Sequence, residues 1–276
     1  MRHQRGYGRL VILLFGIGGL VKAAEYPEPL RCLMEASDTI ELSSPVEGII
    51  AAIEVERGDR VQKGQVVARL DSRIEEIALE LARARAENVS AIRAKEARLK
   101  FLVSQARRNE RLAKRKTVSQ AEREEALQKA EVARQELRAA RVDRETAKLE
   151  AKRARALLEQ KVLRSPINGI VVERPMSVGE YVAGNTTVVT LAKVDPLFVE
   201  AIAPISYYAH VKVGDKVVIH PEEPVGGSYE ARVSVIDQVL DAASGTFGFR
   251  IELSNPDGAL PAGLRCTVTF PDAETD

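Results

Sequence analysis

Ser44-Pro45-Val46-Glu47-Gly48-Ile49-Ile50 has a counterpart far along the chain, in Ser165-Pro166-Ile167-Asn168-Gly169-Ile170-Val171. The first stretch continues to Gly58-Asp59-Arg60-Val61 and Leu70, and the second continues to Gly179-Glu180-Tyr181-Val182 and Leu191. Each half alternates short Val/Ile-rich strands with glycine turns. Because one half is too small to bury a core, we expect the two halves, 43–71 and 162–194, to close on each other as one domain.

The segment between the halves, residues 72–161, contains neither proline nor glycine and therefore predicts long helices. Ser72 and Glu75 have the spacing of a capping box, and so do Ser119 and Glu122. We expect one helix over 73–116 and a second over 120–161. Their similar lengths and short connector predict an antiparallel α-helical coiled-coil hairpin.

Small or apolar residues at three- and four-residue spacing predict the seam of this hairpin. On the second helix the series is Ala126, Ala130, Ala133, Leu137, Ala140, Ala147, Ala151, Ala154 and Leu158, interrupted by Arg144. On the first helix the series is Ile74, Ile77, Leu81 and Ala84, followed by Ile92, Leu99, Val103 and Ala106. Alanine lets helices approach closely but buries little area, so the length of the pair must supply its stability.

The remainder of the chain divides into an N-terminal part and a β-rich C-terminal part. We expect residues 24–42 to be extended and residues 271–276 to form a tail. Strand-like runs between them predict a small antiparallel β-barrel over 195–270, with a short helix near 205–211. The predicted strands are 197–202, 216–220, 229–236, 247–253 and 265–270. The fold class is thus mixed β plus α.

The N-terminus has the pattern of an export signal. Arg2, Arg5 and Arg9 precede an apolar run over 10–21, and small residues follow it at Ala23 and Ala24. We expect a signal peptide over 1–23, cleaved after Ala23; the alternative is an uncleaved inner-membrane anchor. Either way the protein should work outside the cytoplasm.

The composition excludes several classes of function. The chain has 276 residues, a formal net charge of +1, 4% aromatic residues and no Trp, which argues against a nucleic-acid partner. Three His and two Cys leave little material for a metal centre, and His210 and His220 lack ligand spacing. We expect no catalytic residues, no cofactor and no metal site. Cys32 and Cys266 either form a disulfide or remain two separate buried thiols.

Basic residues crowd the connector end of the predicted hairpin. They are Arg107, Arg108, Arg111, Lys114, Arg115 and Lys116, with Glu110 as the local acid. Such a run is either a solvated helix face or a docking surface for an acidic partner, which would relieve the repulsion between like charges.

Together these features resemble the periplasmic adaptor subunits of efflux pumps and type I secretion systems, also called membrane fusion proteins (the HlyD and RND-type adaptor family). The resemblance rests on the two half-motifs, with Gln62-Lys63-Gly64-Gln65 and Leu70-Asp71 in the first and Leu163-Arg164 before the second, flanking a hairpin. It covers about residues 37–270 and implies that the two halves are a lipoyl-like (barrel-sandwich hybrid) domain. No modified lysine turn is present, so covalent carriage of lipoate or biotin is not expected.

The resemblance also implies partners and contact residues. Arg108, Leu112 and Ser119 match the family's Arg-x3-Leu-x6-Ser pattern, which contacts a TolC-type outer-membrane channel. The implied function is a non-catalytic adaptor that links this channel to an inner-membrane transporter, of the RND class in preference to the ABC class. The adaptor would be a homo-oligomer, with six copies as in the family, in the periplasm at the inner membrane. The alternative is a secreted coiled-coil scaffold or cell-envelope binding module without a transport role.

Overall fold

The structure is a computed structural model that describes residues 29–271. The predicted signal peptide, 1–23, and most of the predicted tail lie outside these residues. The chain forms two compact units: 36–195 in one, and 29–35 with 196–271, as far as the structure describes it, in the other. The chain passes between them in β1 (Leu30–Ser43) and in β8 (Thr187–Pro204). Within residues 29–271, no helix is both long enough and apolar enough to cross a membrane.

The two half-motifs close on each other, as the sequence predicts. The first half forms β2 (Gly48–Ile53), β3 (Arg60–Val61) and β4 (Val66–Leu70), and the second forms β5 (Val162–Arg164), β6 (Gly169–Glu173) and β7 (Tyr181–Val182). Three antiparallel pairs join one half to the other: β2 with β7, β3 with β6, and β4 with β5. Neither half could complete these ladders alone.

The internal repeat is also visible in single hydrogen bonds. The Gly58 amide donates to the Val171 carbonyl at 2.9 Å, and the Gly179 amide donates to the Ile50 carbonyl at 2.9 Å. Both glycines have positive φ, 92° and 90°, a conformation that side chains with a Cβ rarely adopt. Each turn thus anchors itself on the strand of the opposite half.

The core of this domain takes residues from both halves. It includes Ile50, Val67 and Leu70 from the first half and Leu163 and Leu191 from the second, all buried. The Leu70 amide donates to the Lys161 carbonyl at 2.8 Å, so the two ends of the helical insert leave the domain at adjacent points. A compact domain therefore holds a helical segment that begins and ends at one edge of it.

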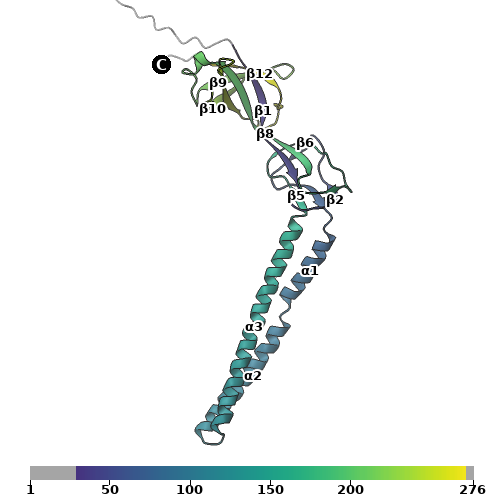
Figure 1. Ribbon diagram of the computed structural model, residues 1–276, viewed down its shortest axis with the longest axis vertical. Helices are drawn as coiled ribbons and strands as arrows, with labels where there is room; N and C mark the ends of the chain where they lie inside the picture. The colour runs from purple at the N-terminus through teal and green to yellow at the C-terminus, as the bar shows by residue number, and fades with distance from the viewer. Residues whose placement is uncertain (1–28, 272–276) are drawn as a thin grey trace, which may run out of the picture. The chain divides into compact units, whose positions relative to one another are not determined.

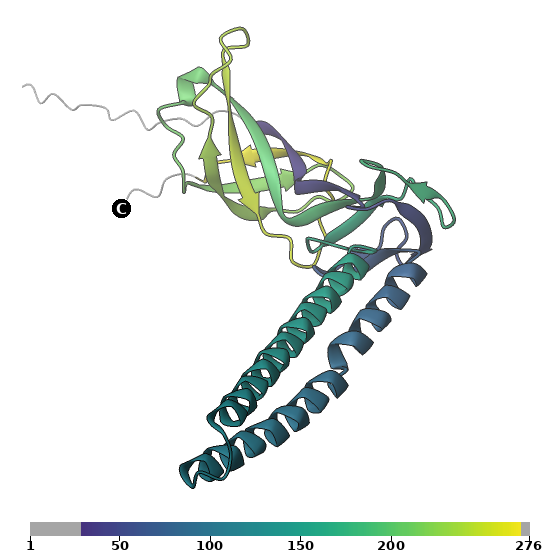
Figure 2. The same ribbon diagram turned by 60° about the horizontal axis from the view of Figure 1, so that its bottom comes forward.

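The helical segment contains three helices rather than the two that the sequence predicts. These are α1 (Arg73–Glu87), α2 (Ser90–Lys114) and α3 (Gln120–Glu159). The prediction of one continuous helix over 73–116 is wrong, because the chain leaves helical geometry at Asn88, whose ψ is 112°. Figure 2 shows the interruption between α1 and α2 opposite an unbroken α3.

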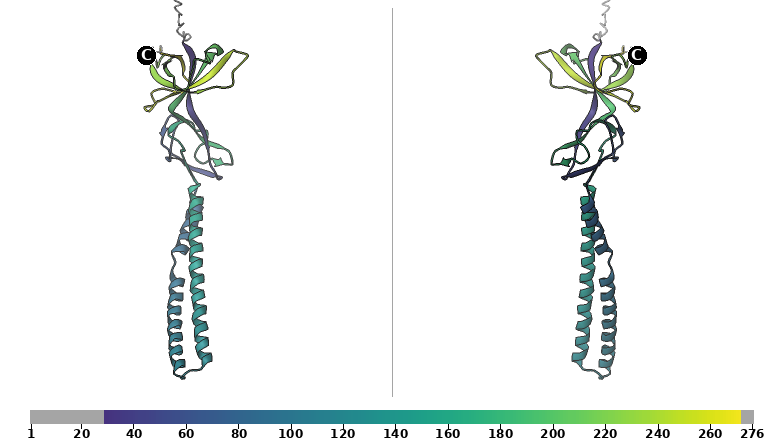
Figure 3. Two further views of the ribbon diagram at one scale, coloured as in Figure 1. Left: turned by 90° about the vertical axis from the view of Figure 1, so that its left-hand side faces the viewer. Right: turned by 90° about the vertical axis from the view of Figure 1, so that its right-hand side faces the viewer.

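α1 and α2 both pack against α3. As the residue numbers rise along α1 and α2, those of the partners on α3 fall. Going outward from the lipoyl-like domain, the Arg144 Nε atom donates to the Ala86 carbonyl at 3.2 Å, and Arg141 pairs with Glu96 at 2.9 Å. Near the far end, Asn109 Nδ2 donates to the Glu122 carbonyl at 3.4 Å. Both views in Figure 3 show α3 beside the other two helices along their length.

The predicted seam is confirmed on α3 and on α2, but it is wrong on α1. Ala126, Ala130, Ala133 and Leu137 are buried on α3, and Ala106 is buried on α2. On α1, however, Ile74 is 80% exposed, Ile77 66% and Leu81 53%, and Ala84 is exposed too. The buried residues of α1 are Leu79 and Ala86 instead. The helix is therefore rotated so that Leu79 faces α3 while Ile74, Ile77 and Leu81 face solvent.

The second unit is built of antiparallel strands. β9 (Lys216–Pro221), β10 (Tyr229–Ile236), β11 (Thr246–Leu253) and β12 (Arg265–Thr269) join the start of β1 and the end of β8. The order of pairing is β1, β12, β9, β10, β11, β8. Alternate residues of β11, among them Phe247, Phe249 and Ile251, are buried in the core. The predicted short helix is a single 3-10 turn, Ile205–Tyr207.

A disulfide joins the first and last strands of this unit. Cys32 on β1 lies directly opposite Cys266 on β12 in the antiparallel register, with a Cα–Cα distance of 4.9 Å. That distance lies within the range that a disulfide requires. Both residues are buried, so the bond is part of the core of the unit.

Candidate functional site

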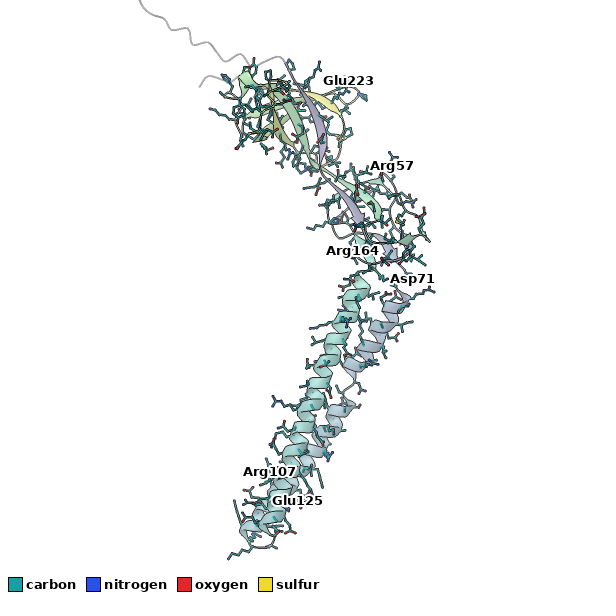
Figure 4. The ribbon with its side chains drawn as sticks, viewed as in Figure 1. Arg57, Asp71, Arg107, Glu125, Arg164 and Glu223 are labelled. Carbon is teal, nitrogen blue, oxygen red and sulfur yellow. A yellow bond between two sulfur atoms is a disulfide. The ribbon has the colours of Figure 1, made fainter. Side chains whose placement is uncertain are left out.

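The far end of the helical segment, which we call the tip (residues 107–119), contains all of the channel-contact and basic residues that the sequence singles out. α2 ends at Lys114, the chain turns through 115–118, and α3 begins after Ser119. Figure 4 labels Arg107 near this end, far from Asp71 and Arg164 at the domain that holds the helices. Figure 1 shows the same end as a short loop between α2 and α3.

The turn at the tip has the hydrogen bonds of a Schellman motif. The Lys116 amide donates to the Ala113 carbonyl at 2.9 Å, and the Thr117 amide donates to the Leu112 carbonyl at 3.0 Å. This motif places its central residue in the left-handed region, where glycine is usual. Here that residue is Lys116, with φ of 57°, and it is the sole non-glycine residue with positive φ among those described. The tip therefore presents a lysine where the backbone favours glycine.

Ser119 closes the turn on its other side as the N-cap of α3. Its Oγ atom accepts a hydrogen bond from the Glu122 amide at 3.2 Å, and the Ser119 amide donates to Glu122 Oε2 at 2.8 Å. The predicted capping box at Ser119 is thus confirmed. The Ser119 hydroxyl also donates to Glu122 Oε2 at 3.0 Å. The hydrogen bonds that the Glu122 carboxylate accepts from the Ser119 amide and, second, from this hydroxyl lower the pKa of Glu122 below its ordinary value.

Arg108 and Leu112 lie one helical turn apart on α2, and Ser119 lies on the other side of the connecting loop 115–118. All three residues are exposed. Leu112 is 37% exposed. The carbonyl of Leu112 anchors the turn, since it accepts from both Arg115 and Thr117 at 3.0 Å. The three residues therefore belong to one small surface, in which a hydroxyl, an apolar side chain and a guanidinium are all accessible.

The basic residues of the tip have no acidic partners in the part of the chain that the structure describes. All six, Arg107, Arg108, Arg111, Lys114, Arg115 and Lys116, are exposed. None of them takes part in the ion pairs found over 29–271, whereas basic residues farther along the helices do, as Lys95 with Glu136 at 2.9 Å. Like charges this close repel one another and create a positive potential at the tip.

A small apolar cluster supports the tip from inside. Ala106, Ala126 and Ala130 are buried there, with Leu102 and Val103 packed against them. The sequence series predicts all of these residues except Leu102. It does not single out Arg123, one turn into α3, whose Nε atom is buried without a hydrogen-bond partner among the described residues. The sequence predicts a charge at Lys116 but not its left-handed conformation, because no residue pattern marks a lysine as left-handed.

No group of three or more His, Cys, Asp or Glu side chains within 29–271 is arranged to hold a metal ion. The ring nitrogens of His220 lie near two hydroxyl groups, Thr269 Oγ1 at 3.3 Å and Ser228 Oγ at 3.1 Å. The ring of His210 is tilted by 58° against that of Tyr207, with ring centroids 6.4 Å apart.

A strand-built domain of two halves, a helical insert with a basic tip and a following β unit define the class of membrane fusion proteins. Comparison with known proteins gives the family. Residues 38–193 match the family model described as CzcB-like, barrel-sandwich hybrid domain, and residues 196–274 match the CusB-like β-barrel domain. The chain belongs to this CzcB-like family, whose proteins are adaptors rather than enzymes.

Two curated relatives illustrate the likeness. The cobalt-zinc-cadmium resistance protein CzcB of Cupriavidus metallidurans is 24% identical over 97% of this chain and 48% of its own length. The nodulation protein NolF of Rhizobium meliloti is 26% identical over 81% of this chain and 57% of its own length. The chain thus spans about half the length of the curated relatives it matches.

Solved structures share the fold. MacA from Actinobacillus actinomycetemcomitans superimposes with a TM-score of 0.73 at 22% identity, over 87% of this chain and 76% of that one. The membrane fusion protein Spr0693 from Streptococcus pneumoniae gives a TM-score of 0.59 at 18% identity, over 89% and 99% of the two chains. The barrel-sandwich hybrid and the small β-barrel that the sequence predicts are therefore confirmed.

Proposed function

We propose that this protein is the non-catalytic periplasmic adaptor of a tripartite efflux or secretion system, linking an inner-membrane transporter to a TolC-type outer-membrane channel. The observation that carries the proposal is the tip: six exposed basic residues that form no ion pair within residues 29–271, at the end of a long helical pair held by the two-half domain. A surface of this kind is suited to docking on an acidic partner at a distance from the rest of the protein.

The helical pair gives the tip its reach. We interpret α1 and α2 with α3 as an antiparallel coiled-coil hairpin, since residue numbers along α3 fall as those along α1 and α2 rise. At 1.5 Å per residue, the 40 residues of α3 span about 60 Å. The strand before α1 (β4) and the strand after α3 (β5) pair with each other. A force or displacement at the domain therefore reaches the tip through packed helices rather than through a flexible linker.

The comparisons support the class of the inner-membrane transporter, and the sequence supports the location of the protein. CzcB relatives are named for cobalt, zinc and cadmium resistance and for cation efflux, which supports a transporter that exports cations as the inner-membrane partner. The match of residues 196–274 to an RND-type β-barrel model supports the RND class for this transporter. The export signal predicted over 1–23 supports a periplasmic location. The role of the adaptor is to seal and couple, while the transporter supplies the energy.

Photo-crosslinking in living cells tests the proposal. A photoreactive residue at position 108, 112 or 119 should give adducts with one outer-membrane protein. The same residue at Arg93, which is exposed on α2 near its start, is the matched control and should give none. An efflux-active strain without tip adducts would contradict the proposal and favour a scaffold without a transport role.

Charge reversal gives a second test with a salt dependence. Arg111→Glu with Arg115→Glu should weaken docking more at low salt than at high salt, since ions already screen part of the attraction at high salt. Arg93→Glu with Arg138→Glu changes the same charge away from the tip, at exposed residues without ion pairs in the described chain, and should leave docking nearly unchanged. Equal losses in the two double variants would argue against a tip-specific role.

A further inference from the structure

The loop between β10 and β11, residues 237–245, carries an adjacent pair of exposed apolar side chains. Val239 is 88% exposed, the largest exposed fraction of any large apolar side chain within residues 29–271, and Leu240 is 37% exposed. Figure 2 shows this loop projecting beyond the strands of the β-barrel unit. Single exposed apolar residues are common on proteins, but an adjacent pair on a projecting loop is typical of a surface that binds a partner.

Both acidic groups of the loop are held against their own backbone. The Asp241 carboxylate accepts hydrogen bonds from the Ala243 amide at 2.9 Å and from the Ser244 amide at 3.4 Å. The Asp237 carboxylate lies so close over Gly248 on β11 that a Cβ at this glycine would collide with it. Val239 and Leu240 are therefore the large side chains that the loop leaves exposed without such contacts to the backbone.

Further exposed apolar side chains lie beside this loop. The Ile205 amide donates to the Gly245 carbonyl at 3.0 Å, which joins the 3-10 turn after β8 to the end of the loop. Ile205 is 37% exposed and Tyr208 38%. The Tyr208 ring packs edge-on against Phe247 of β11, with ring centroids 5.2 Å apart. A tyrosine has an apolar body and a polar hydroxyl, and it is enriched where proteins meet the membrane–water interface.

These two segments, residues 204–214 and 237–245, which we call the barrel end, carry little charge. Together they contain one lysine, Lys212, one histidine, His210, and the two aspartates of the loop. The tip of the helical pair, in contrast, contains six basic residues. A surface with exposed apolar residues and so few basic ones binds lipid by burying apolar area rather than by attraction to anionic headgroups.

The chain enters the β-barrel unit at this same end. Neighbouring strands are antiparallel from β1 through β12, β9, β10 and β11 to β8, so the starts of β1 and β11 and the end of β8 lie together. Both views in Figure 3 show the start of β1 and the β10–β11 loop at one end of the unit. The apolar run 10–21 precedes β1 by the eight residues 22–29, which span at most about 28 Å. While this run is in the inner membrane, the barrel end is close to lipid.

We propose that the barrel end is a lipid-binding surface, in which Val239 and Leu240 insert between the headgroups of the inner membrane and Tyr208 lies at the level of the headgroups. The proposal goes beyond the adaptor function, which assigns protein partners only, and it requires only that the chain is exported. An apolar surface of the transporter is the other occupant to be tested. The position of the apolar run next to this end favours lipid.

Fluorescence quenching by lipids tests the insertion on the full chain as cells export it. The two native cysteines are joined in the disulfide, so Val239→Cys introduces the only free thiol, to which a fluorophore is attached. The vesicles consist of phosphatidylcholine, part of which carries a nitroxide on its acyl chain. We expect strong quenching at position 239. Ala259→Cys is the control and should show none, because Ala259 is exposed between β11 and β12, at the opposite end of the unit.

Removing the apolar pair gives an independent readout from a fluorophore at Ala242→Cys, which is exposed in the same loop. Val239→Ser with Leu240→Ser should raise the lipid concentration for half-maximal quenching by about tenfold or more. The circular dichroism spectrum should not change, since both side chains are exposed. Ile49→Ser with Val178→Ser removes two exposed apolar side chains from the other unit and should have no effect. Any contribution of residues 1–23 is common to all these proteins.

An unquenched fluorophore at position 239, equal quenching at position 259, or quenching that needs anionic lipid and disappears at high salt would each overturn the proposal. If vesicles leave position 239 unquenched while a photoreactive residue there gives adducts with an inner-membrane protein in cells, the surface binds the transporter and the lipid proposal is wrong. Adducts from the tip are measured separately, so either result leaves the test of the adaptor function unaffected.

Discussion

At the scale of single residues, Lys116 is the most informative position of the tip. A residue with a Cβ in the left-handed region costs about 1 kcal/mol relative to glycine. The Schellman hydrogen bonds of the turn hold Lys116 in this conformation. A lysine at this position lowers the stability of the turn but adds a positive charge to the tip. Such a cost is expected where the charge binds a partner.

Lys116→Gly should therefore stabilise the tip by about 1 kcal/mol while it weakens docking on the outer-membrane channel. Hydrogen exchange of the amides around the turn measures the first effect, and crosslinking yield from position 112 measures the second. Thr117→Gly alters the neighbouring residue without removing a charge and serves as the control. A gain in stability with undiminished docking would mean that the lysine charge is not used.

Glu122 makes the tip sensitive to acid. Its folded pKa lies below the ordinary 4.5 because of the hydrogen bonds from Ser119. A carboxylate with a lowered pKa contributes stability that is fully present above its unfolded pKa and is lost as the pH falls through the folded value. Protection of the first turn of α3 should thus decrease below pH 4.5, after correction for intrinsic exchange. Glu122→Gln should be less protected at neutral pH and should not show this decrease.

The two predicted capping boxes show what a residue pattern can and cannot determine. Ser119 caps α3 as its sequence predicts, but the box predicted at Ser72 is wrong: Ser72 makes no capping bond and donates to Glu76 instead. Asp71 accepts from the Arg73 amide in its place, at 3.2 Å. Its pKa is lowered to about 2, mainly by the hydrogen bond from the Arg73 side chain. The strand pairing at Leu70 fixes how the chain enters α1, and no local pattern contains that constraint.

At the scale of elements, the break between α1 and α2 is matched by Arg144 on α3. The last carbonyls of α1 lack helical partners, and the Arg144 guanidinium donates to one of them, that of Ala86. On the other side of the break, Asn88 Oδ1 accepts at 2.9 Å from the amide of Ser90, the first residue of α2. Arg144 interrupts the alanine series of α3 at the level where the opposing helix is interrupted.

Arg144→Leu should destabilise the end of α1 by about 1–2 kcal/mol, because a half-buried carbonyl loses a charged donor. Faster amide exchange over 83–88, with the tip unchanged, would show the effect. Arg138→Leu is the matched control, since Arg138 is exposed on the same helix and makes no ion pair in the described chain. Comparable exchange in the two variants would indicate that the contact at Ala86 contributes nothing.

At the scale of the whole molecule, the disulfide closes the longest loop in the chain, with a sequence separation of 234 residues. It joins the strand that follows the predicted export signal to the last strand of the β-barrel unit. A cross-link over a long loop stabilises chiefly by restricting the unfolded chain, typically by about 2–4 kcal/mol. Both cysteines belong to the β-barrel unit, so the disulfide should stabilise this unit and not the helices.

Cys32→Ser with Cys266→Ser should lower the melting temperature of the β-barrel unit and leave the melting of the helices nearly unchanged. Calorimetry measures the melting temperature of the β-barrel unit, and circular dichroism at 222 nm measures the melting of the helices. Reduction of the unaltered protein should reproduce the shift, whereas the same reductant added to the double variant should have no effect. A double variant that melts like the unaltered protein would show that the bond adds no stability.

The sequence by itself determined the two-half domain, the helical insert, the seam of α3 and the cap at Ser119, because each depends on local periodicity or on a repeat that is visible in the chain. Only the tertiary structure decided which side of α1 faces α3, where the first helix breaks and how the turn at Lys116 is held. α1 offers two possible apolar sides, Ile74 with Ile77 and Leu79 with Ala86, and its own pattern cannot choose between them. The paired strands β4 and β5 fix where α1 starts, and the alanine surface of α3 fixes how closely α1 must pack. Together they determine which side of α1 is buried.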